Sequence, residues 1–370
     1  MTTFSSDEQS ENKVFVTLTG DYPNIGDALI RRRSLAWARM CGQPVAAFVG
    51  RAPDMWCRQI GLTTQDDLYR QKDIKAWVIA MLRAPRGFTL VLEPGEVDLR
   101  LNQYKWETMV LLFSVLTRLK GGRVIRPPRS LSHPSRAMTI WHKLGLQLSA
   151  VVLWRESDSR TLVRTGRVVP DIAFSEAPYG EESSPRPRLL ISLRGLRSRP
   201  SAAWEEAVRT FARNQGLTIT CIAQVRQDEV RTAELASALG GECIDFGNRD
   251  DMEQEHLLRR MYSEGAVVIS DRLHVLILGA LGGCIPCELV PKPSNKVATH
   301  FQAAGITGIT QDAEGSSAAT MLSFLNSIHG RRDKIRAEVM AAHMQLKDIE
   351  SRVVAVSPLS AREDPDLVQR

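Results

Sequence analysis

The sequence lacks several features that would assign a function directly. No apolar run reaches the roughly 18 residues of a membrane-spanning helix, and the most apolar stretch, 265–290, is interrupted by Asp271, Arg272 and His274. The motifs GxxxxGK[ST], GxGxxG, HExxH and GxSxG are all missing. Their absence argues against a P-loop enzyme, a nicotinamide dehydrogenase of the usual kind, a zincin and an α/β-hydrolase.

The sequence also gives no sign of export or of a metal site. The first dozen residues are polar, so we expect no secretory signal peptide and a cytoplasmic protein. Six cysteines in such a chain are expected to be free thiols. Cys284 and Cys287 have the spacing of a zinc or redox motif, but no second pair completes it and the surrounding residues predict a buried strand. We therefore predict no metal site at this pair.

Positive charge is in excess but dispersed along the chain. Lysine and arginine number 48 against 42 aspartates and glutamates, which gives a net charge of +6. Apart from 31–33 there is no basic run, and this argues against a nucleic-acid partner. An anionic small substrate, or attraction to an acidic membrane surface, fits this charge better.

Length and patterning predict the fold class. The 370 residues, 43% apolar and 24% charged, suit a folded chain of about two domains. Short β-type runs such as 14–18 and 123–125 alternate with helical stretches such as 27–40, 66–82 and 104–119. A linker rich in Pro, Gly and Ser follows at 176–188. The predicted fold is α/β, with two Rossmann-like domains facing a cleft in a GT-B-like architecture. The expected parts are domains at 13–178 and 187–330, a helix at 331–356, and polar tails at 1–12 and 357–370.

Two loops that follow predicted strands are candidate binding segments. In the first, 20–27, Asn24 suits an unusual turn and Asp27 suits the cap of the next helix. A capped turn and a substrate loop fit this segment equally well. In the second, Arg155 to Ser159, an arginine stands at the carboxyl end of a strand, where parallel sheets bind anions. The alternative for that segment is a helix cap beside a surface arginine.

The strongest candidate is the segment 267–280. A strand ends there, and Arg272 and His274 open an apolar helix. Free N–H groups, the helix dipole and the Arg272 guanidinium together suit an anion. An imidazole is a side chain suited to proton transfer, and that of His274 stands beside this anion site. This context favours a functional histidine over one that is merely packed.

Taken together, these segments resemble the polysaccharide pyruvyltransferases. The first matching motif is Asn-x-Gly-Asp within 20–27. The second is Arg-Glu-x-x-Ser at 155–159, followed by Pro-Asp-x-Ala-Phe at 170–174. The third is Ser-Asp-Arg-Leu-His at 270–274, followed by Gly-Cys-Ile-Pro at 283–286 and Ser-Asn-Lys-Val at 294–297. They occur in the family's order. Two segments depart from the pattern: 92–96 stands where the family carries a glycine-rich run, and 126–130 where it carries a Leu-Pro-Gln-Ser type.

The resemblance implies that the chain moves a carboxyethylidene group from phosphoenolpyruvate onto two hydroxyls of one sugar, forming a cyclic ketal and releasing phosphate. The donor's phosphate and carboxylate require fixed cations, for which Arg272 and Arg155 are the best candidates, with Arg194 and Lys296 next. We expect His274 to transfer the proton, as acid or as base, and Asp27 to be its partner or to order the acceptor loop. Nothing in this scheme requires a metal or an organic cofactor. The remaining predicted substrate-binding residues are Leu273, through its backbone, Asn24 and Ser159.

The expected acceptor is a glycan or lipid-linked oligosaccharide bound on the side of the amino-terminal domain, with the donor on the carboxy-terminal side. Such an acceptor would bring the chain to the acidic inner face of the membrane as a peripheral protein. Two other functions stay open. One is a GT-B glycosyltransferase that uses a nucleotide sugar, and the other is a non-catalytic homologue that binds a sugar or a partner.

Overall fold

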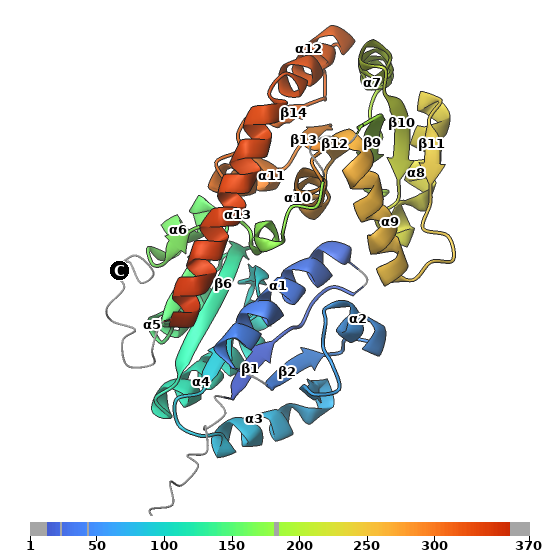
Figure 1. Ribbon diagram of the computed structural model, residues 1–370. Coiled ribbons are helices and arrows are strands. Elements are labelled where there is room, and N and C mark those ends of the chain that lie inside the picture. Colours follow the sequence, from blue (N-terminus) through green and yellow to red (C-terminus); the bar gives the residue numbers. More distant parts are fainter. Residues whose placement is uncertain (1–12, 23, 43, 181–184, 356–370) are drawn as a thin grey trace, which may run out of the picture.

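Two parallel β-sheets follow one another along the chain (Figure 1). The computed structural model describes residues 13–22, 24–42, 44–180 and 185–355. The predicted polar tails, 1–12 and 357–370, lie outside the described residues. Helices cover both sheets, which confirms the predicted α/β fold with two Rossmann-like domains. Among the described residues, no helix is both long and apolar enough to cross a membrane.

The first sheet has the order β3-β2-β1-β4-β6-β7-β8, with β5 paired to β6, and its strand pairs are parallel. Its strands are β1 Val14–Thr17, β2 Val45–Gly50, β3 Asp67–Arg70, β4 Thr89–Val91, β5 Gly95–Asp98, β6 Arg123–Ser132, β7 Val151–Trp154 and β8 Arg167–Val168. Its helices are α1 Ile25–Cys41, α2 Asp54–Gln59, α3 Ile74–Arg83, α4 Tyr104–Leu119, α5 Arg136–Gln147 and α6 Ser157–Val163, with short 3-10 turns η1 Gln71–Asp73, η2 Leu101–Gln103 and η3 Ile172–Ser175.

The second sheet has the order β11-β10-β9-β12-β13-β14 and is also parallel. Its strands are β9 Arg188–Ser192, β10 Thr218–Ile222, β11 Glu242–Ile244, β12 Gly265–Ser270, β13 Ile285–Val290 and β14 Thr310–Asp312. Its helices are α7 Ala202–Gln215, α8 Glu229–Leu239, α9 Asp251–Glu264, α10 Leu273–Leu281, α11 Asn295–Ala303 and α12 Ala318–His329, with the 3-10 turn η4 Arg226–Asp228; the long helix α13, Arg332–Ala355, closes the described chain.

The strand order of both sheets reverses direction at one point. In the first sheet this switch lies between β1 and β4, and in the second between β9 and β12. Loops that leave two neighbouring strands at a switch run in opposite directions and open a crevice beyond the carboxyl ends of the strands. The topology therefore places candidate ligand sites beside the loops after β1, β4, β9 and β12.

Successive side chains of β1 point to opposite faces of the first sheet and pack into two different apolar clusters. Val14 and Val16 face the apolar cluster that contains α1, whereas Phe15 faces the cluster on the other side of the sheet. There Phe15 meets the indole of Trp77 on α3 edge to face, with ring centroids 5.8 Å apart, and Trp77 in turn meets Phe113 on α4. The same side of the first sheet is thus covered by α3 and α4.

Two expectations for local structure were wrong. The helix expected over 66–82 is the edge strand β3 followed by η1 and the shorter helix α3, because its first residues pair with β2. The strand expected at 123–125 continues to Ser132 as β6. Pro127 and Pro128 fall where the pairing of β6 with β7 shifts register, so their missing N–H groups break no regular ladder.

The two domains are joined by buried polar contacts as well as by α13, which runs alongside both in Figure 1. At the centre of one such contact lies Glu255 on α9. Its carboxylate accepts hydrogen bonds from Arg32 Nη2 of α1 at 2.6 Å, from Arg259 Nη2 at 2.8 Å and from Gln59 Nε2 at 3.2 Å. Burial opposes ionisation of Glu255, but the arginines outweigh it and lower its pKa.

Substitution of Glu255 by glutamine is expected to destabilise the fold by about 2 kcal/mol at pH 7, because the partly buried guanidinium groups of Arg32 and Arg259 lose this buried carboxylate and keep only Glu176 as an acidic partner. A carboxyl with a lowered pKa stabilises the fold above the pKa it has when unfolded, and that stabilisation is lost as the pH falls through the folded value. The difference in unfolding free energy between the parent and Glu255→Gln should therefore decrease at acidic pH. Urea unfolding at several pH values measures it, with Glu206→Gln, an exposed residue of α7, as control; equal stability of both variants at pH 7 would contradict the assignment.

Candidate functional site

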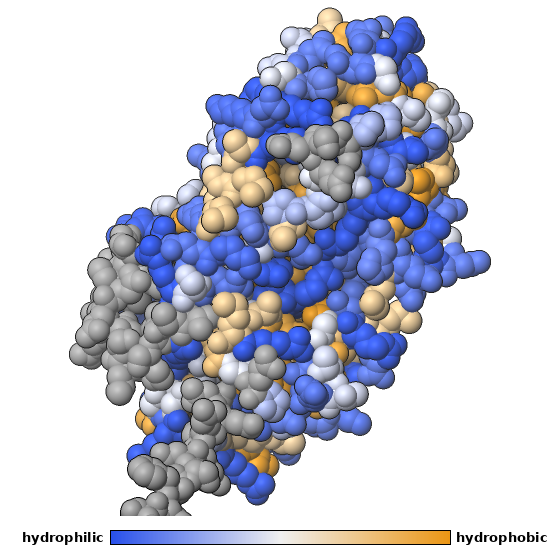
Figure 2. All heavy atoms as spheres, viewed as in Figure 1, coloured by the Kyte–Doolittle hydropathy of each residue, from blue (hydrophilic) through white to orange (hydrophobic). Residues whose placement is uncertain are grey.

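Two adjoining cavities lie between the switch-point loops. The smaller, about 120 Å³, is lined by Asn24, Asp27, Gly95, Glu96, Arg155, Arg194, Gln224, Arg272, Leu273, His274 and Lys296. The larger, about 350 Å³, lies in the amino-terminal domain and also takes Asp27 and Glu96 into its lining. Hydrophilic side chains gather across the middle of the face seen in Figure 2, where the domains meet. We name these the interdomain cavity and the amino-terminal cavity.

The interdomain cavity brings together residues that lie far apart in the sequence. Eight of the nine predicted site residues line it: Asn24, Asp27, Arg155, Arg194, Arg272, Leu273, His274 and Lys296. They come from the loops or first helical turns that follow β1, β7, β9, β12 and β13. Convergence of these segments on one point is the feature that the sequence alone could only suggest.

Three helices start at the interdomain cavity. The first turns of α1, α10 and α11 all contribute lining residues. In the described structure, the N-cap side chains of α10 and α11, Arg272 and Ser294, make no capping hydrogen bond to the free backbone N–H groups. Partial positive charge at uncapped helix starts adds to the cationic side chains, so the cavity suits an anion.

His274 lies against the amino-terminal domain at the closest contact of the site. A Cβ atom built on Gly26 would lie only 2.4 Å from His274 Nδ1, so only glycine permits α1 to approach this imidazole. On its other side, His274 Nε2 is 3.7 Å from Asp171 Oδ2. This distance suits an ion pair with a protonated ring but exceeds a hydrogen bond, and Nε2 has no hydrogen-bond partner among the described residues.

Asp171 is fully buried and links His274 to Arg155. Arg155 Nη1 donates to Asp171 Oδ2 at 2.8 Å, and both Nε and Nη2 donate to Ser130 Oγ. Burial opposes ionisation of Asp171, but the Arg155 guanidinium and His274 outweigh it and hold the pKa of that carboxyl well below its usual range. Arg155 therefore enters the cavity as a buried cation held rigidly by a carboxylate, and not as the surface arginine that was the alternative.

Arg272 is held by a carboxylate from the same domain. Its Nη2 donates to Asp228 Oδ2 at 2.6 Å, and the other oxygen of Asp228 accepts the N–H of Gly195. The Nε atoms of Arg272 and Arg194 are buried and have no hydrogen-bond partner among the described residues. Orphaned donors in a cationic cavity are places where an anion's oxygens complete the hydrogen bonding.

Lys296 and Glu96 join the two domains across the cavity. Lys296 Nζ donates to Glu96 Oε2 at 2.7 Å. Burial raises the pKa of Glu96, but the hydrogen bond and charge of Lys296 outweigh this and lower it overall. Glu96 belongs to 92–96, the segment that departs from the family pattern, and its neighbour Gly95 needs the positive φ of +102° that glycine adopts readily. This segment, which departs from the family pattern, therefore contributes to the lining of the interdomain cavity.

Ser159 does not belong to the site, and this prediction was wrong. It is buried in the first turn of α6, where its N–H donates to the Glu156 carboxylate and its hydroxyl also contacts that carboxylate. The same Oγ accepts the N–H of Leu131 at 2.7 Å. Ser159 thus ties α6 to β6.

The cap of α1 also differs from the expectation. Asn24 is the cap, since its Oδ1 accepts the N–H of Gly26, whereas Asp27 folds back on the loop. Asp27 Oδ2 accepts the N–H of Asp21, and Oδ1 accepts from Arg31 Nη1, both at 2.8 Å. With both oxygens engaged, Asp27 fits the role of ordering the loop better than that of a proton acceptor.

Besides Gly95 and Glu96, sequence reasoning missed four residues in or beside the site. Asp171, Asp228 and Gln224 are buried polar residues that hold or line the cationic cluster, and His300 lies buried behind Arg155. Burial and the neighbouring Arg155 lower the pKa of His300 well below its usual value, so it stays neutral. The only available signal was the Pro-Asp-x-Ala-Phe motif around Asp171, because the other three stand in ordinary helix or loop sequence.

The amino-terminal cavity has a different character. Six carboxylates line it against two arginines, Arg31 and Arg129. The Glu93 carboxylate accepts hydrogen bonds from the Thr19 hydroxyl and from Trp106 Nε1, and the Trp106 ring is stacked on Phe48. A fixed indole beside carboxylates suits a polyhydroxylated ligand, which offers apolar ring faces and hydroxyl donors.

Cys284 and Cys287 are free and buried in the carboxy-terminal core. Burial raises the pKa of the Cys284 thiol to about 12. Within the described residues no group of three or more His, Cys, Asp or Glu side chains is arranged to hold a metal ion. Both thiols pack as small apolar groups.

Comparison with known proteins identifies the fold. No protein-family model matches the chain, and no curated protein sequence matches it. Among solved structures it is similar to the UDP-GlcNAc 2-epimerase from Neisseria meningitidis bound to UDP-GlcNAc, with 10% identity, a TM-score of 0.58, and 93% of this chain and 99% of that chain covered. It is also similar to a glycosyltransferase from Rickettsia africae ESF-5 (9% identity, TM-score 0.52, 94% and 100% covered) and to the spinosyn rhamnosyltransferase SpnG (12%, 0.51, 92% and 99%).

These similarities span nearly the whole of each chain, so they include both domains. They define the class of structure as the two-domain GT-B-like fold, as predicted. At such low identity the likeness extends to the fold alone, and the chemistry has to be argued from the site.

Substitution of Gly26 by alanine tests the closest contact of the site. The added methyl group overlaps the imidazole of His274, so we expect a loss of about 1–3 kcal/mol in unfolding free energy from overpacking. Gly330→Ala is the matched control, because a Cβ there meets no atom closer than 3.6 Å and its φ is −65°. Thermal unfolding of both variants measures the difference, and a Gly26→Ala protein as stable as the control would show that α1 does not pack on His274.

Proposed function

We propose that the chain is a phosphoenolpyruvate-dependent pyruvyltransferase that binds its donor in the interdomain cavity and its sugar acceptor in the amino-terminal cavity. The observation that carries the proposal is the convergence of Arg155, Arg194, Arg272 and Lys296 on one small cavity beside His274. Three of these cations, Arg155, Arg272 and Lys296, stand in segments in which the sequence resembles the family, and Arg194 follows β9.

Charge and size support a compact donor with two anionic groups. Four basic side chains face two carboxylates, Asp27 and Glu96, and both carboxylates already pair with a cation. A phosphate and a carboxylate on one small molecule match a cluster of this kind through charge-assisted hydrogen bonds. At about 120 Å³ the cavity is smaller than the roughly 300–1,000 Å³ of sites for larger ligands.

A nucleotide-sugar glycosyltransferase is the second candidate, and the structural neighbours favour it. The Neisseria meningitidis epimerase is bound to UDP-GlcNAc, and the two other neighbours are glycosyltransferases. Against it stands the lining of the interdomain cavity, in which the described residues include no Phe, Tyr or Trp to stack on a nucleobase, and only the imidazole of His274 is aromatic. The single apolar lining residue is Leu273.

The proposed chemistry balances without a further reactant. A proton is added to the methylene carbon of phosphoenolpyruvate. The central carbon of the donor then takes on the character of an oxocarbenium ion, and a sugar hydroxyl attacks it. A second hydroxyl of the same sugar attacks the same carbon, and the bond between this carbon and the phosphate oxygen breaks. Each of the two sugar hydroxyls loses one proton. One of these protons makes up for the proton that was added to the methylene carbon, and the other leaves with the phosphate.

In this scheme His274 transfers the proton and the surrounding charges stabilise the intermediate. Asp171, whose Oδ2 lies 3.7 Å from His274 Nε2, is the carboxylate placed to position that imidazole. Arg155 and Arg272 are held by their carboxylate partners before any ligand arrives. Fixed charges of this kind stabilise charge that develops during the reaction without having to reorganise.

Calorimetric titration with phosphoenolpyruvate tests the donor. We expect binding by the full chain, and a loss of at least about tenfold in affinity for Arg272→Ala because one charge-assisted contact is removed. Arg213→Ala, an exposed arginine on α7 far from the cavity, should bind as the parent does. Binding of a uridine or guanosine diphosphate sugar with no response to phosphoenolpyruvate would favour the glycosyltransferase instead.

Substitution of His274 by glutamine tests the proton transfer. Phosphate release from phosphoenolpyruvate, assayed with a panel of simple glycosides as acceptors, should fall by about a hundredfold or more. Donor affinity should change much less, because the cations remain. A variant that releases phosphate at the parent's rate would remove His274 from the mechanism, and a parent that binds sugars but never releases phosphate would favour the non-catalytic homologue.

A further inference from the structure

The outer helices of the amino-terminal domain carry charge of one sign. Between 74 and 147 there are twelve Lys and Arg against four Asp and Glu, so this stretch is more positive than the whole chain with its +6. Within α3, α4 and α5 the only acidic residue is Glu107, which is buried. The basic residues of these helices are Lys75, Arg83, Lys105, Arg118, Arg136 and Lys143. None of the six forms an ion pair with a described residue.

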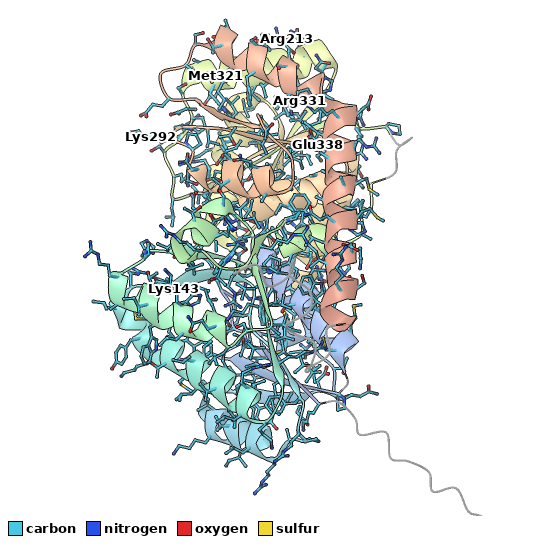
Figure 3. All side chains as sticks on the ribbon, turned by 90° about the vertical axis from the view of Figure 1, so that its left-hand side faces the viewer. Lys143, Arg213, Lys292, Met321, Arg331 and Glu338 are labelled. Atoms are coloured by element: carbon cyan, nitrogen blue, oxygen red, sulfur yellow. The ribbon has the colours of Figure 1, made fainter. Side chains whose placement is uncertain are left out.

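The same helices expose large apolar side chains. Leu119 is 80% exposed and Ile140 64% exposed, and they are accompanied by Leu82, Tyr104, Leu112 and Leu144. Neighbouring helices pack side by side, α3 on α4 and α4 on α5, so these residues share one flank. Figure 3 places Lys143 on this flank, away from Arg213 and Met321 at the far end of the carboxy-terminal domain. We call it the basic-apolar flank.

The basic-apolar flank reaches the rim of the amino-terminal cavity. Gln103 and Trp106 line that cavity, while their neighbours Leu101 and Tyr104 are exposed. An acceptor in the cavity would therefore extend along the start of α4 as it leaves. The apolar residues of α4 continue from that point to Leu119.

We propose that the basic-apolar flank docks on an anionic lipid bilayer and so presents the amino-terminal cavity to a sugar carried by a lipid. Basic side chains attract the negative surface, and the apolar side chains between them insert at the boundary of headgroups and acyl chains. Docking requires neither donor nor acceptor, so its failure is distinguishable from failure of the pyruvyltransferase proposal.

Charge distinguishes this partner from a second copy of the chain. In a two-fold interface the flank would face itself, and six basic residues on each side would lie opposite one another with no exposed carboxylate to pair with. Helices of the other domain differ, since α7, α8 and α9 mix acidic and basic residues. Helices α3, α4 and α5 offer no exposed carboxylate to their basic side chains, so an anionic surface complements this flank.

Co-sedimentation of the full chain with vesicles tests the proposal. Vesicles containing roughly one third phosphatidylglycerol should bind the protein, and vesicles of phosphatidylcholine alone should not, with binding weakened by salt. Lys105→Glu, Arg136→Glu and Lys143→Glu together should weaken binding by about a hundredfold or more, at roughly fivefold for each charge near the surface. The control, Arg213→Glu, Arg260→Glu and Lys292→Glu, changes the net charge equally on the other domain and should bind as the parent does.

A second variant separates apolar insertion from charge and guards against misfolding of the first. Ile140→Ser with Leu144→Ser removes two exposed side chains and should weaken binding while the dependence on salt persists. Equal binding of the parent and the triple variant, or no binding of the parent to anionic vesicles, overturns the proposal. So does a parent that is dimeric in gel filtration and becomes monomeric in either variant without a change in vesicle binding.

Discussion

The site depends on the contact between Gly26 and the imidazole of His274. Because residue 26 has no side chain, the start of α1 reaches the start of α10, and the two domains meet at that point. This approach brings His274 within 3.7 Å of Asp171 and sets the interdomain cavity beside it. A larger residue at 26 would separate His274 in one domain from the buried Asp171 and Arg155 of the other.

Ion pairs impose the second constraint. Arg155 is held by Asp171, Arg272 by Asp228, and Lys296 by Glu96, so each positive group enters the site with a carboxylate beside it. Pairing makes the burial of Arg155 and the partial burial of Arg272 tolerable, and the Nε atom of Arg272, which has no hydrogen-bond partner among the described residues, leaves a donor for an anion. The amino-terminal cavity, with its six carboxylates, has the opposite polarity and would repel a second anion. One anionic and one uncharged, hydroxyl-rich substrate fit this division.

Much of the fold could be predicted from the sequence, because alternation of strand and helix and the linker near 176–188 are local patterns. Helix α4, for example, has the bounds that were expected. Edge strands such as β3 could not be foreseen, since they exist only through pairing with a neighbour. At the site, Arg272 and His274 stand out by their place after a strand, whereas Asp228 acquires its role only when the chain folds. Ser159 fits the family motif but serves to fasten α6.

The central claim is that the interdomain cavity holds phosphoenolpyruvate. The most direct measurement is a crystal structure of the chain soaked with this compound. The account predicts the donor between Arg155, Arg272 and Lys296, with its methylene carbon within reach of His274. A structure in which the donor is absent from this cavity at saturating concentration, and a nucleotide diphosphate sugar binds there instead, would contradict it.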